Sequence, residues 1–490
     1  MSAPTLTTRP LIGLEIHVQL ATRTKLFCGC RVEFGAEPNS RVCPMCLGLP
    51  GALPVLNREA LTLAMRLAMA LNCKIARFTK WDRKSYFYPD LPKNYQISQY
   101  DLPLAENGSF EFTCEGETRT VRIRRAHVEE DAGKNLHDNP AITQVDLNRT
   151  GTPLLEIVTE PDLHSAEEAY AFCTELHKLA TYLGVTEGVM QKGQMRFEPN
   201  INVVISDGDA EFATPICEVK NLNSFRAIRG AIDYEIQRHT EVWQKDHHYT
   251  ANEQPKENRG WDDDKNVTVF QRSKEEAQDY RYFPDPDLVP VVINDEWLSA
   301  VKADMPELPA ARRARLVSEC GLSAKDAAQI VADRATADLF DAAIQTGADP
   351  KLLGKHFISF WAKHANKRES TIAELGIDAA RIAELATLAG DGKINATAAA
   401  AIAEKMLEST DRPSAIAKAE RLEQIQDTAA IEALVDEAIA GNPKAVEIAK
   451  SGGKKWEKSL GFLQGQVMQK SRGSAPPKLV RELLQKKLGL

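Results

Sequence analysis

Two hydrophobic periodicities divide this chain of 490 residues. Alternating apolar and polar residues, the pattern of half-buried strands, fall before about residue 300, whereas helical patterns dominate after it. Strands that precede helices, instead of alternating with them, are typical of an α+β fold. We therefore predict an N-terminal cradle domain built on an antiparallel sheet with helices, then an all-helical domain and a small helical tail domain. The predicted boundaries are 1–295, 296–410 and 411–490.

The segment from Ile12 to Leu20 alternates most clearly. Its even-numbered residues are all apolar, whereas Glu15, His17 and Gln19 take the odd positions. This pattern predicts a strand with Glu15 and His17 side by side on its wetter face. By themselves, the two side chains fit the solvated face of an edge strand. A site requires further carboxylates on neighbouring strands.

Four such carboxylates lie in later strand patterns or next to them: Glu129, Glu130, Glu156 and Glu198. Glu156 stands among apolar neighbours, where an unpaired carboxylate is costly. Two carboxylates about 4 Å apart repel by roughly 4 kcal/mol at an effective dielectric constant of 20. If they converge, they must therefore become protonated or bind cations. Oxygen ligands with one imidazole favour a hard ion such as Mg²⁺, which suits an incoming polyphosphate.

The strand pattern that holds Glu198 contains Pro199. Proline has no N–H to donate to a sheet, so this strand is expected at a sheet edge or at a bulge. An earlier strand pattern, from Thr118 to Val128, loses its alternation at Arg124 and Arg125, which leaves the face of Glu129 open. The segment from Asp82 to Tyr95 shows neither periodicity and is expected to be a long, structured, functional loop.

Two close pairs of cysteines, separated by twelve residues, lie within 28–46. Four thiols paired on two tight turns predict a tetrahedral, structural zinc site; the alternative is a loop with four reduced thiols. The ligands would be Cys28, Cys30, Cys43 and Cys46. The odd total of nine cysteines argues against a disulfide framework. With neither a signal-peptide pattern nor an apolar run of membrane length, we expect a cytoplasmic protein without membrane contact.

Charge is distributed unevenly along the chain. Residues 451–490 hold nine lysines or arginines against two glutamates, a net +7, so the first 450 residues carry −15 of the total of −8. Solubility alone does not require an acidic body with a basic tail.

The chain also lacks the G-x-x-x-x-G-K-[ST] phosphate loop and the G-x-S-x-G nucleophile elbow.

A set of ordered motifs closely resembles one family over essentially the full length. That family is the B subunit of the tRNA-dependent aspartyl/glutamyl amidotransferase. The motifs that carry the resemblance are Ile12–His17, Cys43–Gly51, Asp82–Asp90, Tyr95–Ser98, Glu129–Lys134, Asp146–Glu156, Glu218–Ser224, Tyr280–Pro284 and, in the tail, Gly461–Met468. One departure is Arg196-Phe-Glu-Pro-Asn200, where relatives carry Arg-Cys-Asp, a small residue and Asn. There the carboxylate of Glu198 is one methylene longer.

The resemblance implies a glutamine-hydrolysing, ATP-dependent carbon–nitrogen ligase that acts in protein biosynthesis. Such enzymes use ATP and Mg²⁺ to phosphorylate the side-chain carboxylate of Glu-tRNA(Gln) or Asp-tRNA(Asn), and ammonia then displaces the phosphate. The implied ammonia source is a separate amidase, the A subunit, and with a small C subunit the three form a heterotrimer. Two alternatives are a zinc-containing tRNA-binding adaptor without catalysis and a free-standing metallohydrolase.

The resemblance also assigns residues. It implies Mg²⁺ ligands, with Glu198 near them, at Glu15, His17, Glu129 and Glu156. It implies that Glu130 lies where ammonia arrives and that Lys84 and Lys93 line the ammonia route. The tail is implied to bind misacylated tRNA through Lys454, Lys455, Lys458, Lys470 and Arg472. The alternative for the tail charge is a solvated helical face.

Overall fold

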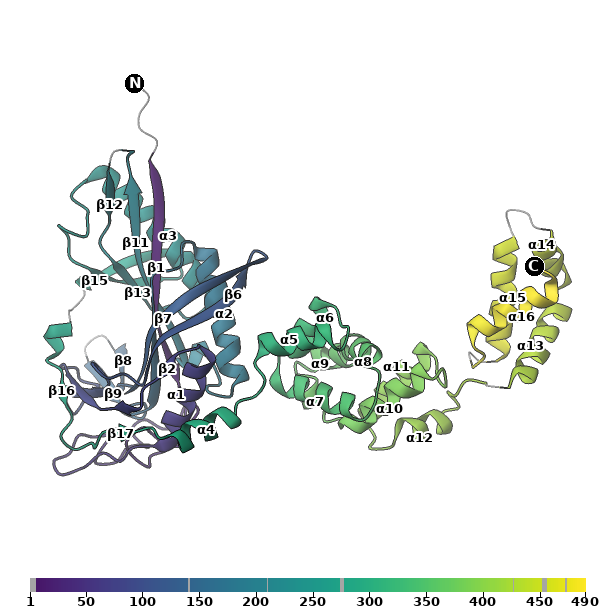
Figure 1. Ribbon diagram of the computed structural model, residues 1–490, viewed down its shortest axis with the longest axis horizontal. Helices are drawn as coiled ribbons and strands as arrows, with labels where there is room; N and C mark the ends of the chain where they lie inside the picture. The colour runs from purple at the N-terminus through teal and green to yellow at the C-terminus, as the bar shows by residue number, and fades with distance from the viewer. Residues whose placement is uncertain are drawn as a thin grey trace, which may run out of the picture. The chain divides into compact units, whose positions relative to one another are not determined.

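The structure, a computed structural model, describes residues 6–139, 142–208, 210–273, 277–425, 427–451, 456–471 and 474–490. The chain forms two compact units, Met1–Leu308 and Pro309–Leu490. The first unit contains the sheets, and the second is helical (Figure 1). The predicted α+β fold, with a sheet domain before the helices, is confirmed. The further boundary at 410/411 stays a prediction.

A ten-stranded sheet forms the centre of the first unit. Its order is β15-β14-β13-β11-β1-β10-β7-β6-β2, and β12 pairs with β11. Neighbouring strands are antiparallel except β13 and β14, which run parallel, so the sheet is mixed. The strands are β1 (Thr7–Gln19), β2 (Lys74–Ile75), β6 (Ala105–Cys114), β7 (Glu117–Glu130), β10 (Pro153–Thr159), β11 (Met195–Ser206), β12 (Glu211–Ala213), β13 (Cys217–Lys220), β14 (Glu257–Asp262) and β15 (Val267–Ser273).

The expectation that Pro199 lies at a sheet edge or a bulge is wrong, because β11 lies between β1 and β13. Pro199 pairs with Leu14, whose N–H donates to Oγ1 of Thr159 on the opposite neighbour, β10, at 2.9 Å. Leu14 and Pro199 are therefore a non-hydrogen-bonded pair, and the proline nitrogen points away from β1. On that side β13 pairs only with Asn200 and Ile201, so the missing N–H removes no ladder bond.

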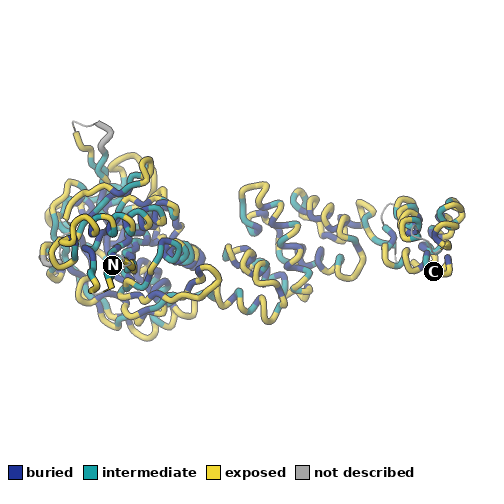
Figure 2. Tube along the Cα trace, turned by 90° about the horizontal axis from the view of Figure 1, so that it is seen from above, coloured by how far each residue is buried: buried dark blue, intermediate teal, exposed yellow. Residues whose placement is uncertain are grey.

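Three helices pack on the apolar face of this sheet: α1 (Arg58–Ala70), α2 (Ala166–Tyr182) and α3 (Phe225–Lys245). The even-numbered residues from Ile12 to Val18 in β1, and Leu20 just after it, are buried in one core with side chains of these helices. Burying each such side chain contributes about 1.5 to 3 kcal/mol. Buried stretches of the chain lie inside this unit and exposed ones on its outside (Figure 2). Ser165 caps α2 by accepting from the N–H of Glu168. The odd-numbered residues of β1 consequently face away from this core.

Shorter elements surround the large sheet. A three-stranded sheet joins β4 (Asp82–Ser85), β5 (Tyr95–Ser98) and β16 (Phe283–Pro284). The segment expected to be one long loop therefore begins and ends in strands, too short to show a periodicity. The remaining pairs are β3 (Phe78–Thr79) with β17 (Val291–Val292), and β8 (Lys134–Asn139) with β9 (Ile142–Asp146); α4 (Asp295–Ala303) closes the unit.

The second unit consists of helices. Residues from Ile431 to Leu488 share a hydrophobic core of their own. Short 3-10 or π turns occur at Met190–Lys192, Ala277–Tyr280, Phe357–Trp361 and Ala373–Leu375. The α-helices are α5 (Pro309–Ser318), α6 (Ala324–Val331), α7 (Arg334–Gln345), α8 (Pro350–His356), α9 (Ala362–Lys367), α10 (Ala379–Gly390), α11 (Ala396–Met406), α12 (Pro413–Ala419), α13 (Thr428–Gly441), α14 (Pro443–Lys450), α15 (Trp456–Lys470) and α16 (Pro477–Leu488). Among the described residues, no helix is long and apolar enough to span a membrane.

A buried carboxylate, Glu235, ties α3 to the edge of the large sheet. It is fully buried, accepts from Nη2 of Arg238 at 2.7 Å, and lies 3.4 Å from Nε of Arg259 on β14. Burial raises the pKa of Glu235, but hydrogen bonds from His239 and Arg238 outweigh it and hold the pKa well below its ordinary value. The stability that this charge contributes is therefore present above the ordinary carboxyl pKa and is lost as the pH falls below it.

We expect Glu235→Gln to lower the free energy of unfolding of the first unit by about 3 kcal/mol, because it removes the fully buried anion of Arg238 and Arg259 and leaves them only Glu257. Urea unfolding at neutral pH, followed by tryptophan fluorescence, measures this loss. Glu241→Gln, an exposed position on the same helix, is the control and should change stability by less than about 0.5 kcal/mol. Equal stability of the two variants would contradict the prediction.

Candidate functional site

The register of β1 with its two neighbours places polar residues in one row on the face opposite the helices. His17 pairs with Glu156 of β10 on one side and Arg196 of β11 on the other. Glu15 pairs with Glu198, and Glu156 pairs in turn with His127 of β7. Directly opposed residues of antiparallel strands share a face, so side chains from four strands converge.

Four of these residues, together with Glu129 two positions after His127 in β7, form what we term the acidic cluster: Glu15, His17, His127, Glu129 and Glu156. Nε2 of His17 lies 3.4 Å from a carboxylate oxygen of Glu156, 3.5 Å from one of Glu129 and 3.9 Å from one of Glu15. Nε2 of His127 lies 3.5 Å from Glu156 and 3.6 Å from Glu129. The four residues predicted as metal ligands thus lie together. The sequence interpretation did not single out His127.

The protonation of the acidic cluster reflects its crowding. Burial, followed by the negative charge of Glu156, raises the pKa of Glu15 to about 7. Burial also acts to raise the pKa of Glu156, but the charge of His127 and the hydrogen bond from His17 outweigh it and lower the pKa to about 2. Conversely, burial acts to lower the pKa of His17, but Glu129 and Glu156 raise it well above its ordinary value. A positive charge is therefore strongly favoured among these carboxylates.

The donor set of the acidic cluster fits a hard divalent cation. One donor atom each from Glu15, His17 and Glu156 lies within 4.8 Å of the other two, and the same holds for His127, Glu129 and Glu156. Both imidazoles turn Nε2 toward the carboxylates, and their buried Nδ1 atoms have no hydrogen-bond partner within the described ranges. Carboxylate oxygens with imidazole nitrogen are ligands that Mg²⁺ or Mn²⁺ accepts.

Glu198 lies beside the acidic cluster and has a cation of its own. Nζ of Lys220 lies 2.6 Å from an oxygen of Glu198 and 2.9 Å from one of Glu218. Burial acts to lower the pKa of Lys220, but Glu198 and Glu218 together raise it above its ordinary value. One oxygen each of Glu15, Glu198 and Glu218 also lies within 4.8 Å of the others. The alternation around Glu218 was visible in the sequence, but nothing in it assigned a role to Glu218 or Lys220.

Glu130 occupies surroundings different from those of its neighbour Glu129. It is buried, forms an ion pair with Lys93, and accepts from the backbone N–H of Ile97 at 2.9 Å. Glu129 instead accepts from Oγ of Ser98 at 3.1 Å and faces the two histidines. Consecutive residues of a strand point to opposite faces, which explains the separation.

Lys84 lies on the side of Glu129. Burial acts to lower its pKa, but the charges of Glu129, Tyr282 and Glu156 raise it well above the ordinary value. Its ammonium group lies 4.8 Å from the ring centre of Tyr280, at the distance of a cation–π contact. The two lysines predicted to share one route thus lie near different carboxylates: Lys93 at Glu130, and Lys84 at the acidic cluster.

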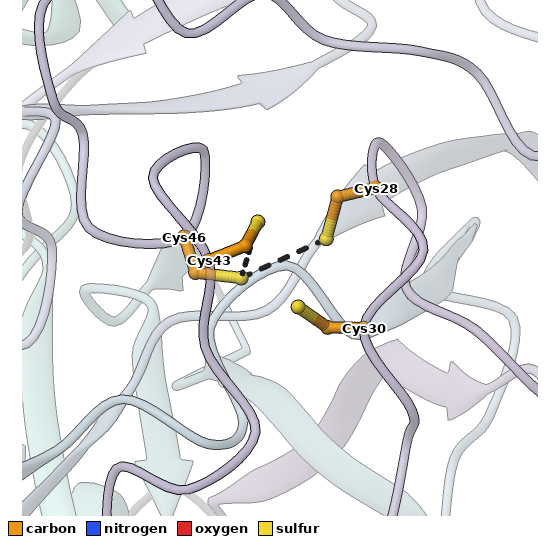
Figure 3. Close-up of side chains that lie close together, drawn as sticks. All are labelled: Cys28, Cys30, Cys43 and Cys46. Carbon is orange, nitrogen blue, oxygen red and sulfur yellow. Dashed lines mark hydrogen bonds between the residues drawn. The ribbon is translucent and has the colours of Figure 1, made fainter.

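The four cysteines of 28–46 lie together, with their sulfur atoms in the space between two loops (Figure 3). Sγ of Cys46 is 3.7 Å from that of Cys28 and 3.8 Å from that of Cys43. A tetrahedral site with zinc–sulfur bonds of about 2.3 Å has sulfur–sulfur edges of about 3.8 Å. The hydrogen bond from Cys28, and among the smaller causes the charge of Lys25, lower the pKa of Cys46 to about 4. This four-cysteine site can bind a metal.

The tail residues are only partly described. Lys458 and Lys470 are exposed on α15, and Nζ of Lys470 lies 2.6 Å from a carboxylate oxygen of Glu437. Lys454, Lys455 and Arg472 lie outside the described residues. Lys487 on α16 pairs with Asp436 at 2.6 Å. Part of the positive charge of this tail is thus neutralised within the chain.

The sheet with its acidic cluster and the helical region that follows correspond to two known domains. Residues 10–299 match the family model described as the GatB/GatE catalytic domain, and residues 338–488 match that described as the GatB domain. Similar proteins, each named as the B subunit of aspartyl/glutamyl-tRNA(Asn/Gln) amidotransferase, occur in Carboxydothermus hydrogenoformans, Syntrophotalea carbinolica and Rhodopirellula baltica. The first two are 46% and 44% identical and align over 98% of both chains. The third is 46% identical over 97% of this chain and 95% of its own.

The chain therefore belongs to the family of aspartyl/glutamyl-tRNA(Asn/Gln) amidotransferase B subunits, as its motifs led us to expect.

For the four-cysteine site we expect one zinc ion per chain in the purified protein and close to none in Cys46→Ser, because a three-sulfur set cannot close the tetrahedron. Metal analysis by atomic absorption measures this stoichiometry. Cys320→Ser, outside the site, is the control and should retain full zinc content. Zinc-free wild-type protein after purification in zinc-supplemented buffer would refute the assignment.

Proposed function

We propose that this chain carries out the ATP- and Mg²⁺-dependent phosphorylation of the side-chain carboxylate of Glu-tRNA(Gln) or Asp-tRNA(Asn), followed by amidation with ammonia. The observation that carries the proposal is the convergence of four side chains from three strands on one face of the large sheet: Glu15, His17, Glu129 and Glu156. The crowded carboxylates on this face favour a bound cation. Burying these charged groups without a cationic ligand would be unfavourable.

The reaction has two balanced steps. An oxygen of the tRNA-linked carboxylate attacks the γ-phosphorus of ATP, and ADP leaves with the electrons of the broken phosphorus–oxygen bond. Ammonia then attacks the carbonyl carbon of the acyl phosphate, inorganic phosphate leaves, and the nitrogen loses a proton. The nucleophile of the first step is already ionised at neutral pH, so it needs no general base. Positioning and charge neutralisation account for most of the catalysis.

Residues of the acidic cluster would hold the divalent ions, with Glu15, His17, Glu129 and Glu156 as ligands and Glu198 near them. When bound, these ions neutralise charge on the phosphates. Lys220 keeps Glu198 and Glu218 compensated at the margin of the site, where a polyphosphate adds further negative charge. His127 lies against Glu129 and Glu156 and fixes their orientation.

Ammonia would enter past Glu130, with Lys93 and Lys84 along its route. Glu130 is a buried carboxylate beside Lys93, so it offers an incoming ammonium ion an anionic partner away from bulk water. Lys84 lies further on, beside the carboxylates of the acidic cluster. The sequence has no nucleophile motif for glutamine hydrolysis, which supports a heterotrimer in which a separate amidase, the A subunit, and a small C subunit are the partners.

The tail would bind the misacylated tRNA through its basic residues. The acidic body of the chain cannot supply this attraction, whereas residues 451–490 carry a net +7. An adaptor that only binds zinc and tRNA, without catalysis, would use the four-cysteine site and the tail in the same way. Binding of zinc and tRNA alone would not explain the acidic cluster, and for that reason we favour the catalytic function over the adaptor.

The decisive experiment uses Glu156→Gln in the reconstituted complex with its A and C partners. We expect amide formation from Glu- or Asp-tRNA to fall by at least about 100-fold, because the change removes a proposed carboxylate ligand of the divalent ion that neutralises the phosphates, while tRNA affinity stays within twofold. Glu111→Gln, an exposed position on β6, is the control and should retain full activity. Unchanged turnover of Glu156→Gln would leave the adaptor as the better description.

For the tail, we expect deletion of residues 411–490 to weaken binding of Asp- or Glu-tRNA by at least tenfold at low salt. The full chain should also lose affinity steeply as salt rises, because contacts to phosphates release counterions. Filter binding across a salt series measures both effects. Equal affinity of the truncated and full chains would place the tRNA contacts elsewhere.

A further inference from the structure

A lysine, Lys25, is enclosed beside the four-cysteine site. It is fully buried and is among the largest side chains without exposed surface. It lies between β1 and Cys28, on the segment that leads into the first cysteine pair. Lysine is seldom buried without an anionic partner, so its surroundings require an explanation.

The ammonium group of Lys25 has three protons and three acceptors. Nζ donates to the backbone oxygen of Arg41 at 2.8 Å, to Sγ of Cys46 at 3.2 Å and to the backbone oxygen of Leu147 at 3.5 Å. A compact ammonium group suits three separate acceptors, whereas a planar guanidinium does not. In the described part of the chain no carboxylate lies within ion-pair distance of it.

The negative charge that compensates the ammonium group of Lys25 must therefore come from the cysteine sulfur atoms. Enclosing an unpaired ammonium group costs several kcal/mol, and neutral thiols would not offset that cost. Four thiolates around a divalent metal carry a net charge of −2, which one lysine reduces to −1. Lys25 is thus an independent indication that the four-cysteine site is anionic.

The acceptor at Leu147 connects this arrangement to a second segment, residues 145–152. The cysteine-bearing loops hold that segment by several hydrogen bonds. Among them, the N–H of Asn39 donates to Asp146 at 3.0 Å, that of Arg41 to Asn148 at 2.8 Å, and that of Leu26 to the oxygen of Gly151 at 2.8 Å. Segment 145–152 therefore moves with the cysteine loops.

The same segment holds the end of β7. The N–H of Gly151 donates to the oxygen of Asp131 at 2.9 Å, and the N–H of Asp131 donates to the oxygen of Thr152 at 2.8 Å. A Cβ atom built on Gly151 would lie 3.6 Å from Cδ of Lys25 and 3.7 Å from a carboxylate oxygen of Glu130. Lys25 and Glu130 thus both pack against one backbone position.

We propose that Lys25 is a positioning residue: its ammonium group offsets part of the negative charge of the metal-loaded four-cysteine site and fixes segment 145–152, which sets the position of Glu130 and Asp131. Metal in the cysteine site, outside the acidic cluster, would then determine the geometry at the point where ammonia arrives. That last consequence rests on the proposed role of Glu130; the charge compensation and the mechanical link do not.

The first test compares zinc release from the full chain to a chromogenic chelator. Lys25→Met, similar in size but uncharged, should release zinc about 10 to 100 times faster than wild type, the usual effect of losing a partner of a metal ligand. Arg23→Met removes an exposed cation two residues away and should leave the rate unchanged. If Lys25 only fills space, Lys25→Met will release zinc at the wild-type rate, and the proposal fails.

The second test uses unmutated protein. Hydrogen exchange is compared between zinc-loaded and zinc-stripped chains at the amides of Gly151 and Asp131, with Val128 in β7 as internal control. Stripping should accelerate exchange at the first two and leave Val128 protected. Unchanged exchange at Gly151 and Asp131 would disprove the link.

Neither measurement involves ATP, tRNA or amide formation. An active complex with unchanged zinc release would refute the role of Lys25 alone, and faster release in a chain that supports no amidation would refute only the proposed function.

Discussion

The alignment of β1 between β10 and β11 is the constraint on which the site depends. It places Glu15 and His17 against Glu156 on one side and Glu198 on the other. Because side chains alternate in a strand, a slip of β1 by one residue would move Glu15 and His17 into the apolar core. The even-numbered residues that pack on the helices prevent that slip. The hydrophobic core therefore maintains an arrangement of like charges that electrostatics alone would disperse.

A basic side chain lies beside each group of crowded anions. His17 and His127 lie among Glu129 and Glu156, and Lys220 lies between Glu198 and Glu218. At the four-cysteine site, the ammonium group of Lys25 donates to the sulfur of Cys46. These partners offset part of the crowding, and the acidic cluster still favours a bound cation.

Much of this could be predicted from the sequence, because period-two alternation and cysteine spacing are local signals. The strand of Glu15 and His17, the α+β order and the convergence of Glu129 and Glu156 followed from such signals and from the family motifs. His127 was overlooked because alternation fails just before it. The structure shows why: the register of β7 with β10 shifts opposite Arg124, an extra residue that breaks the period.

Lys25 and Lys220 could not be found in the same way. Lysine is usually exposed, and partners distant in the sequence, such as Cys46 for Lys25 and Glu198 for Lys220, help to make these two exceptions. The prediction of a sheet edge or bulge at Pro199 failed for a related reason. A proline forbids one hydrogen bond, and only the pairing of β11 shows that none was needed there.

The central position of β1 also matters during synthesis on the ribosome. Of these three strands, β1 is synthesised first. Its partners β10 and β11 follow much later, and β11 ends at residue 206. At usual rates of translation β1 waits roughly 10 to 40 s for them. Until residue 159 has been made, neither edge of β1 has its native partner strand. An unpaired strand edge is a template for pairing with other chains, so chaperones near the ribosomal exit would protect the nascent chain most in this first part of the interval.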